Sequence, residues 1–390
     1  MPDRREPPFS DVPPPVDFHR HAIDEQDIAA AVDVLRSLFL TTGPVTGLVE
    51  TKLAGYLGRR HVVAMNNCTT ALMLSLKALD IGVGDEVITS PMTFAASITA
   101  IMHAGATPVL VDVDPATALI DPEAVEAHIT PRTRAVLPVH LYGQMADMRR
   151  LVEICRPRDI AIVEDAAHAV ESSRDDTGPG QLGDLACLSF YATKNLTCGE
   201  GGAVVTDNDA LAQRLRRLRL HGMSKTASDR HGRKYEHWDI TELGYKANLP
   251  DILAALLLHQ IDRLEDLRVR REQIARRYEA AFAALEEVDF PRVLPACRSA
   301  RHLFTIWVPE ARRDQTLLDL GSRGIGVAVN YRAVHLLSYF RQQLGYEPGN
   351  FPHAERIGRR TITLPCYPGL RAEEQQRVID AVREVQAGWS

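Results

Sequence analysis

Short apolar runs alternate with stretches of helical spacing along much of the chain. Apolar residues repeat with a helical period at 24–39, 47–57, 70–79 and 97–103, where we predict helices. The short apolar runs predict strands at 61–65, 86–88, 109–111, 135–139, 160–163, 185–190 and 203–205. Because strands and helices take turns along the chain, we expect an α/β protein with a mostly parallel, mixed sheet covered on both faces.

The chain changes character after Pro250. From 251 to 285 it is charged and helix-forming, and the next proline is Pro291. Shorter elements follow, with a strand predicted at 302–308 and a helix at 312–323. We therefore expect a flexible N-terminal segment at 1–16, a large domain at 17–260 and a smaller α+β C-terminal domain at 261–390.

Composition narrows the class of function. The 390 residues are 45% hydrophobic, which is enough for a large buried core. The 51 acidic side chains outnumber the 45 basic ones and give a formal charge of −6, which argues against a nucleic-acid partner. No stretch reaches the roughly 18 apolar residues of a membrane span, and the polar, proline-rich start lacks a secretion signal. We expect a soluble protein with no membrane partner.

The cysteines give a further indication of compartment. None of the six cysteines forms a close pair at metal-ligand spacing, and no compact disulfide framework is present. Reduced cysteines are typical of a cytoplasmic protein. We therefore expect a cytoplasmic location and no metal site.

A carboxylate and a lysine stand at the ends of predicted strands. The strand at 160–163 runs into Glu164 and Asp165, and the strand at 185–190 leads into Lys194 before another strand begins after Gly201-Gly202. Ligands bind α/β sheets at the carboxyl ends of their parallel strands. The sequence therefore predicts that Asp165 and Lys194 face one ligand.

Pyridoxal 5′-phosphate needs both groups. A lysine that attacks a carbonyl must be deprotonated, and burial beside a cationic cofactor lowers its pKa. The pyridine nitrogen needs an ionised carboxylate that keeps the ring protonated. Taken singly, a strand-end Asp is more often a helix cap and a loop Lys is more often surface.

The segment 66–70 lies between a strand and a helix. It is able to face an anion at the helix N-terminus, or simply to cap the helix.

Several motifs in this order resemble the DegT/StrS sugar aminotransferases, within the fold-type I pyridoxal phosphate enzymes. The resemblance is carried by EDAAHA at 164–169, SFYATKNLTCGEGG at 189–202 and PVHLYGQ at 138–144. It continues at 41–44, 85–94, 105–112 and 244–251, and it covers nearly the whole chain from about Asp17 onward. The resemblance implies a homodimer whose two active sites lie at the interface.

The resemblance also implies which residues hold the cofactor. Lys194 is its covalent anchor, Asp165 pairs with the ring nitrogen, and Phe94 and His168 lie against the ring. Cys68, Thr69 and Ser189 contact the phosphate. Lys246 departs from the pattern, since many members carry an asparagine there that reaches the phosphate from the other subunit. A lysine still serves a phosphate as a point charge.

Substrate contacts follow from the resemblance as well. They are Thr42, Gly43, Tyr191, His221, Asn330, Tyr331 and His335. The stretches at 193–202, 221–223, 244–246 and 324–335 look most like bacterial UDP-4-keto-pentose 4-aminotransferases. A few pocket contacts set sugar identity, so a 4-keto-6-deoxyhexose stays open.

We predict from this a transamination with L-glutamate as donor. Lys194 moves the proton between the amino-acid Cα and the cofactor C4′, and Asp165 keeps the ring charged. The amino group then passes to the keto carbon, by preference C4, of a nucleotide-linked keto sugar.

The same residues are compatible with other functions, which the sequence supports less well. A cyclitol or another non-nucleotide ketone would use Asp165 and Lys194 in the same way. Lys194 speaks against a non-catalytic pyridoxal phosphate sensor and against the family's dehydratase branch, which replaces this lysine. A dinucleotide-binding fold is set aside, because Gly324-Ile325-Gly326 is followed by Val329 where the third glycine belongs.

Overall fold

The computed structural model describes residues 14–224 and 237–389. Its centre is a mixed sheet of seven strands in the order β1-β8-β7-β5-β4-β2-β3. β8 runs antiparallel to β1 and β7, and the other neighbouring pairs are parallel. The strands are β1 (His61–Met65), β2 (Glu86–Thr89), β3 (Thr107–Leu110), β4 (Thr133–Val136), β5 (Ala161–Asp165), β7 (Leu185–Ser189) and β8 (Gly202–Thr206).

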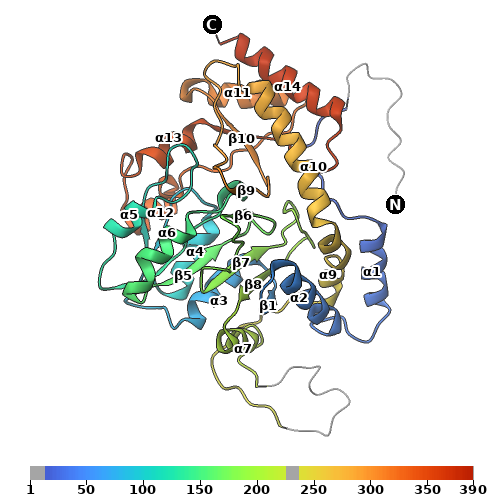
Figure 1. Cartoon of the computed structure of the whole chain (residues 1–390), viewed down its shortest axis with the longest axis vertical. Coiled ribbons are helices and arrows are strands. Elements are labelled where there is room, and N and C mark those ends of the chain that lie inside the picture. Colours follow the sequence, from blue (N-terminus) through green and yellow to red (C-terminus); the bar gives the residue numbers. More distant parts are fainter. Residues whose placement is uncertain (1–13, 225–236, 390) are drawn as a thin grey trace.

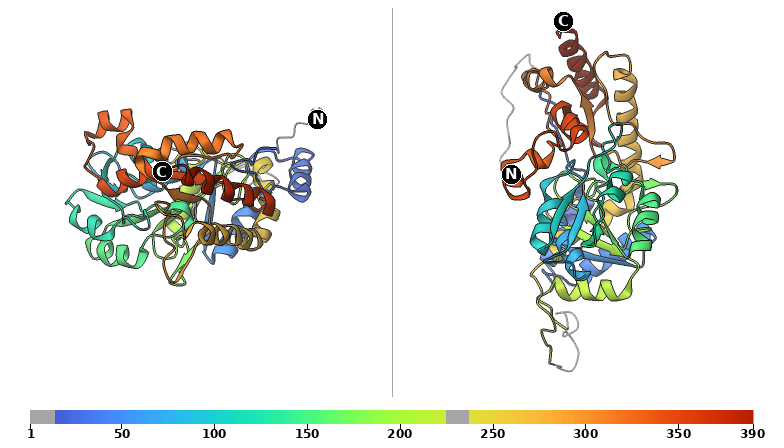
Figure 2. Two further views of the ribbon diagram at one scale, coloured as in Figure 1. Left: turned by 90° about the horizontal axis from the view of Figure 1, so that it is seen from above. Right: turned by 90° about the vertical axis from the view of Figure 1, so that its left-hand side faces the viewer.

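Helices cover both faces of this sheet, as Figures 1 and 2 show. Alternate side chains of a strand point to opposite faces. In β1, Val63 and Met65 belong to the core on one face, whereas Val62 and Ala64 belong to the core on the other. The helices of this part are α1 (Glu25–Leu35), α2 (Pro44–Leu57), α3 (Cys68–Ala78), α4 (Ala95–Ala104), α5 (Pro122–Ala127), α6 (Met148–Cys155) and α7 (Asp209–Leu218).

A second core lies beyond the sheet. It is built on the antiparallel pair β10 (Phe304–Trp307) and β11 (Thr361–Leu364). The helices α11 (Glu310–Ser322) and α14 (Ala372–Ala387) pack around it. The remaining elements of the C-terminal part are β9 (Cys297–Arg298), which pairs with β6 (Ser173–Arg174), and the helices α12 (Ser338–Leu344) and α13 (Pro352–Arg360), whose buried side chains belong to the core on the sheet.

One long helix joins the two cores. α10 (Leu258–Phe282) contributes Ile261 to the core under the sheet and Tyr278 to the second core. In Figure 1 it runs from the sheet toward α14. A boundary near 260 stays a prediction. Val16 also packs in the second core and bridges Ile325, while the first 13 residues of the expected flexible segment lie outside the described residues.

The helix-forming stretch at 251–285 folds as two helices, α9 (Asp251–Ala255) and α10. The side chain of Gln260 donates to the carbonyl of Leu256, and also to that of Thr197 at 2.7 Å. The bond from Gln260 gives the carbonyl of Leu256 a partner at the break between α9 and α10. The other predicted strands and helices are present; the strand at 61–65 has the predicted ends, and the rest are shifted at one or both ends.

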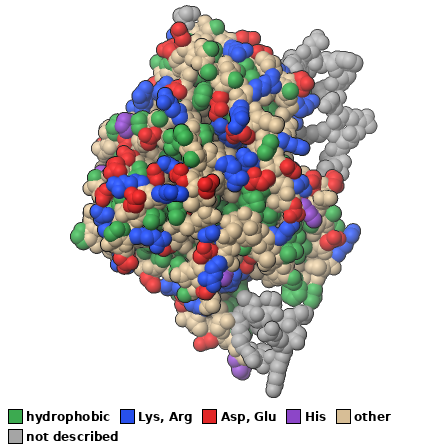
Figure 3. Space-filling view, in the orientation of Figure 1, with side chains coloured by type: hydrophobic (Ala, Val, Ile, Leu, Met, Phe, Trp, Pro, Cys, Tyr) green, Lys and Arg blue, Asp and Glu red, His purple; other side chains and the backbone are tan. Residues whose placement is uncertain are grey.

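Acidic and basic side chains are mixed over the face seen in Figure 3. Among the described residues, no helix is both long enough and apolar enough to cross a membrane.

Candidate active site

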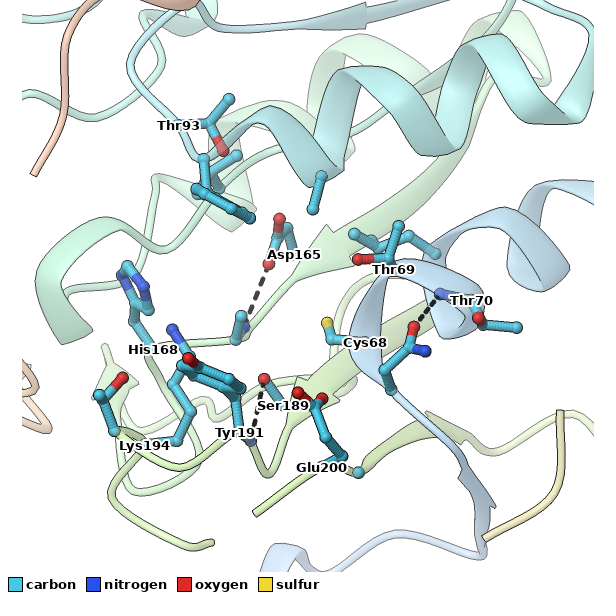
Figure 4. A pocket seen from close by; sticks show the side chains of 18 of the residues that line it. Cys68, Thr69, Thr70, Thr93, Asp165, His168, Ser189, Tyr191, Lys194 and Glu200 are labelled. Atoms are coloured by element: carbon cyan, nitrogen blue, oxygen red, sulfur yellow. Dashed lines mark hydrogen bonds between the residues drawn. The ribbon is translucent and has the colours of Figure 1, made fainter. Parts of the chain in front are cut away.

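A cavity of about 790 Å³ opens at the carboxyl ends of β5 and β7. In Figure 4, His168 and Lys194 lie on one side of it, Cys68 and Thr69 at the start of α3 lie on the other, and Asp165 lies between them. The cavity brings together ten residues that the sequence pointed to: Cys68, Thr69, Phe94, Asp165, His168, Ser189, Tyr191, Lys194, Asn330 and Tyr331.

Asp165 is the last residue of β5 and is 6% exposed. Its Oδ2 accepts a hydrogen bond from the hydroxyl of Ser97 at 2.7 Å, and its Oδ1 accepts one from the amide of Ala167 at 3.1 Å. The hydroxyls of Ser97 and Thr93 lie 2.6 Å apart. These contacts hold the carboxylate in one orientation at the edge of the cavity.

Lys194 lies in the turn between β7 and β8, where its amide donates to the carbonyl of Tyr191 at 2.9 Å. Burial lowers the pKa of its amine from the usual 10.5 to about 8, although the nearby Asp165 and Cys68 act in the opposite direction. At pH 7 the amine is therefore still mostly protonated, but about a tenth of it is uncharged, roughly 300-fold more than for an ordinary lysine. An uncharged amine is the form that attacks a carbonyl.

His168 is buried and neutral. Its Nδ1 accepts a hydrogen bond from the amide of Tyr142 at 3.2 Å, so the ring proton of the neutral form is on Nε2, 3.3 Å from the hydroxyl of Tyr331. Burial, followed by the charge of Lys194, holds the pKa of His168 well below its usual value. Phe94, by contrast, is 61% exposed at the rim, with its ring 5.9 Å from that of Tyr331.

The start of α3 forms the opposite wall. Asn67 caps the helix by accepting a hydrogen bond from the amide of Thr70 at 2.8 Å, while among the described residues the amides of Cys68 and Thr69 have no acceptor. A Cβ on Gly202 would lie 2.6 Å from the Cys68 nitrogen. Close backbone approach is therefore what Gly202 provides. Free amides at a helix N-terminus bind anions such as phosphate.

The donor set of this cavity fits pyridoxal phosphate. Free amides at the start of α3 suit its phosphate, the carboxylate of Asp165 suits its ring nitrogen, and the amine of Lys194 suits its aldehyde. Ser189 also lines the cavity, and burial raises the pKa of the Cys68 thiol well above its usual value, so this thiol stays protonated.

Thr42 and Gly43 lie outside the cavity and hold two chain segments together. The hydroxyl of Thr42 donates to the carbonyl of Leu249 at 2.6 Å. The amide of Gly43 donates to the carboxylate of Asp251 at 2.8 Å, just before α2. Their expected contact with substrate stays a prediction.

Three more expected residues are also outside the cavity lining. Lys246 and His221 are exposed. His335 is fully buried, and its Nε2 lies 3.1 Å from the carboxylate of Glu355. His335 packs in the second half of the chain, and its expected contact with substrate, like the contacts expected of His221 and Lys246, stays a prediction.

The sequence reasoning missed several polar residues of the site. Ser97 and Thr93 orient Asp165, and Glu200 lines the cavity. The only signal for the first two was a pair of hydroxyls one helical turn apart after a strand. His302, whose Nε2 lies 3.5 Å from the Nζ of Lys194, comes from a segment far along the chain and gave no signal.

The chain matches the model of the DegT/DnrJ/EryC1/StrS aminotransferase family over residues 21–383. The chain belongs to this family. It is 41% identical over 372 residues to the spore coat polysaccharide biosynthesis protein SpsC of Bacillus subtilis, which covers 94% of this chain and 96% of SpsC.

Solved structures of similar proteins agree with this assignment. The PMP form of Spr1654 of Streptococcus pneumoniae, described as a sugar aminotransferase, superposes with a TM-score of 0.91 at 33% identity over 96% of this chain and 99% of Spr1654. PseC of Helicobacter pylori, an aminotransferase involved in the biosynthesis of pseudoaminic acid, gives 0.90 at 27% identity over 96% and 100%.

Membership of the DegT family confirms the predicted α/β fold, the aminotransferase activity and the cofactor. The family depends on pyridoxal phosphate, and Spr1654 has been solved in a PLP form as well as a PMP form. The protein is a DegT-family sugar aminotransferase.

Proposed function

We propose that the protein transfers the amino group of L-glutamate to the keto carbon, C4, of a nucleotide-linked keto sugar. The observation that carries the transamination is the cavity in which the carboxylate of Asp165 and the low-pKa amine of Lys194 face the start of α3. The sugar is supported by SpsC and PseC, whose names refer to polysaccharide and sugar-acid biosynthesis.

Each residue of the site has a defined task in this proposal. Bound pyridoxal phosphate supplies an electrophilic carbon and a ring that accepts electron density when the substrate loses a proton. The amine of Lys194 removes the proton at the Cα of L-glutamate and afterwards gives it up as an ammonium, so it serves as base and then as acid. Asp165 holds a proton on the ring nitrogen. The neutral ring of His168 and the ring of Phe94 would offer flat surfaces to the cofactor ring.

A second hollow supports a substrate with a phosphate group. A cavity of about 310 Å³ adjoins the first and shares Phe94 and Tyr331 with it. Arg313 and Arg332 line it. The Nε of Arg313 lies 2.6 Å from the carboxylate of Asp314, whereas its Nη1 is buried with no hydrogen-bond partner in the described part of the chain.

Guanidinium groups bind phosphates through paired hydrogen bonds. A keto sugar beside Lys194 would therefore extend its nucleotide past Phe94 and Tyr331 toward Arg313 and Arg332. A free keto sugar or a cyclitol has no group for these arginines, which is why we favour the nucleotide-linked substrate.

We further propose that the protein works as a homodimer. Apolar side chains are exposed near the cavity and on the segment after α7: Phe94 is 61% exposed and Leu243 is 87% exposed. In Figure 1 the described residues directly after α7, 219–224, extend away from the body of the molecule. In such a dimer, the contact with the cofactor phosphate that the resemblance implies for Lys246 would come from the partner subunit. Sedimentation velocity tests this, and a fully active monomer contradicts it.

A cytoplasmic location is part of the proposal. All six cysteines are free thiols in the structure. Free thiols persist in a reducing compartment. Cell fractionation tests this location, and recovery of the active protein outside the cytoplasm contradicts it.

The test of the substrate is an absorbance titration of the bound cofactor. L-glutamate is added first, which converts the cofactor to its amino form, and ketones are then added one at a time. UDP- and dTDP-linked 4-keto sugars are compared with the same sugars without nucleotide and with a keto cyclitol. Recovery of the original spectrum with a nucleotide-linked sugar alone supports the proposal, and NMR of the product locates the aminated carbon. Recovery with the cyclitol alone overturns it.

A further inference from the structure

A buried chain of polar side chains lies behind Lys194. His302 is 5% exposed, and its Nε2 faces the Nζ of Lys194 at 3.5 Å. Its Nδ1 lies 3.1 Å from the Oδ1 of Asn195. Asn195 in turn donates to the carboxylate of Glu171 at 3.1 Å, and Glu171 forms an ion pair with Arg271. Both members of this ion pair are 1% exposed.

The hydrogen bonds of Asn195 fix the proton of His302. The Nδ2 of Asn195 donates to Glu171 and also to the carbonyl of Ala300 at 3.1 Å, and both of these partners only accept. The amide therefore cannot be turned round, and its Oδ1 must accept from the ring. The proton of the neutral His302 ring is then on Nδ1. Its Nε2 presents a lone pair to Lys194.

The surroundings of His302 keep the ring neutral. Burial lowers the pKa of His302 well below its usual value, and His168, Lys194, His19 and Arg271 act in the same direction. The ring of His168 is closest, with 4.3 Å between ring centroids. The nearest carboxylate behind Asn195 is that of Glu171, whose charge is balanced by Arg271.

We propose that His302 is a positioning residue for Lys194. Its Nε2 accepts a hydrogen bond from one N–H of the Lys194 amine, which turns the lone pair and the other hydrogen of Nζ toward the cavity. An amine tethered by one of its hydrogens keeps its lone pair aimed at the Cα proton that it must remove. As an ammonium it keeps a second hydrogen aimed at the site that receives the proton. This inference rests on the assignment of Lys194 as the lysine that moves the proton.

Two variants of His302 separate the roles of its two ring nitrogen atoms. His302→Asn keeps a donor near the position of Nδ1, so the bond to Asn195 persists, but it has nothing at the position of Nε2. His302→Gln reaches the position of Nε2 with an amide oxygen that accepts a hydrogen bond. The pair is matched in chemistry, and the two side chains differ by one methylene.

The measurement is the single-turnover reaction of each holoenzyme with L-glutamate and with L-glutamate deuterated at Cα. We expect His302→Asn to slow the reaction by about 10- to 100-fold, because the amine is misplaced. The affinity for L-glutamate should stay within about threefold, and the isotope effect should rise as proton transfer becomes limiting. His302→Gln should recover most of the rate. Equal rates and equal isotope effects in His302→Asn and wild type overturn the inference.

The pKa of the free amine gives a readout apart from activity. An acceptor stabilises a charged N–H donor more than a neutral one. Loss of Nε2 should therefore lower the pKa of the Lys194 amine in cofactor-free His302→Asn and leave it near wild type in His302→Gln, measured by the pH dependence of urea unfolding of the cofactor-free proteins. A pH dependence that is the same in all three proteins contradicts the inference.

Asn195→Ser provides a second route to the same test, should His302→Asn fail to fold. It frees the ring to exchange its proton between the two nitrogen atoms without altering His302, and we expect a smaller defect with a raised isotope effect. A wild-type isotope effect in Asn195→Ser overturns the inference. Lys194→Ala controls the premise: if it still binds the cofactor covalently and turns over, the assignment of Lys194 fails, not the role of His302.

Discussion

Replacing Lys194 by Met should stabilise the cofactor-free protein at neutral pH. Burial lowers the pKa of this amine from 10.5 to about 8, which corresponds to a cost of about 3 kcal/mol for holding the ammonium in the fold. At pH 7 the folded and unfolded chains are both protonated at Lys194, so the wild type carries the whole cost. Methionine has a similar length and no charge, so Lys194→Met removes it.

The cost has a defined pH dependence. Between pH 8 and pH 10.5 the unfolded chain holds the proton while the folded chain has lost it, so the stability of the wild type rises with pH in this window. The advantage of Lys194→Met over wild type should fall from about 3 kcal/mol at pH 7 to about 1 kcal/mol at pH 10. Urea unfolding of both cofactor-free proteins at the two pH values measures it.

Comparing two pH values separates the charge from the change in side-chain packing, because the packing term is the same at both. An advantage that does not change with pH would refute the claim that Lys194 is held with a lowered pKa. Lys194→Gln, which is neutral and polar, should behave like Lys194→Met in its pH dependence.

Three further substitutions test the neighbouring parts of the site. Arg332→Ala should raise the KM for a nucleotide-linked keto sugar by about tenfold without changing the single-turnover rate with L-glutamate; an equal KM contradicts the phosphate role. Ser97→Ala removes a donor to Asp165 and should weaken cofactor binding by about fivefold, measured by fluorescence titration. Gly202→Ala places a Cβ 2.6 Å from the backbone at the start of α3 and should weaken cofactor binding more than Ser97→Ala does. Gly47→Ala, with nothing within 4 Å of the new Cβ, is its control, and equal effects of the two alanines contradict the reasoning.

Local pattern indicated the centre of the site, and the family resemblance assigned the roles of its residues. Asp165 and Lys194 each follow a short apolar run, and the carboxyl ends of neighbouring parallel strands meet at one edge of the sheet. β5 and β7 are neighbours, paired through Val163 and Leu185. The strand pattern placed each residue at the end of a strand, and the structure adds that the two strands are neighbours.

Contacts between segments that are distant in the sequence could not be predicted from local sequence patterns. His302 reaches Lys194 from more than a hundred positions along the chain, and Gln260 lies at the break between α9 and α10 through a bond to Thr197. His335 carries the same residue type as a site histidine, yet it is buried against Glu355. Residue type and spacing do not encode these packing choices, which depend on the tertiary arrangement.

The most direct test of the account is to reduce the holoenzyme with borohydride and map the pyridoxyl group by peptide mass spectrometry. We expect a single labelled peptide, with the label on Lys194, and no label in Lys194→Ala. A label on another lysine, such as Lys52, Lys77 or Lys246, would contradict the assignment on which the proposed chemistry and the role of His302 both depend.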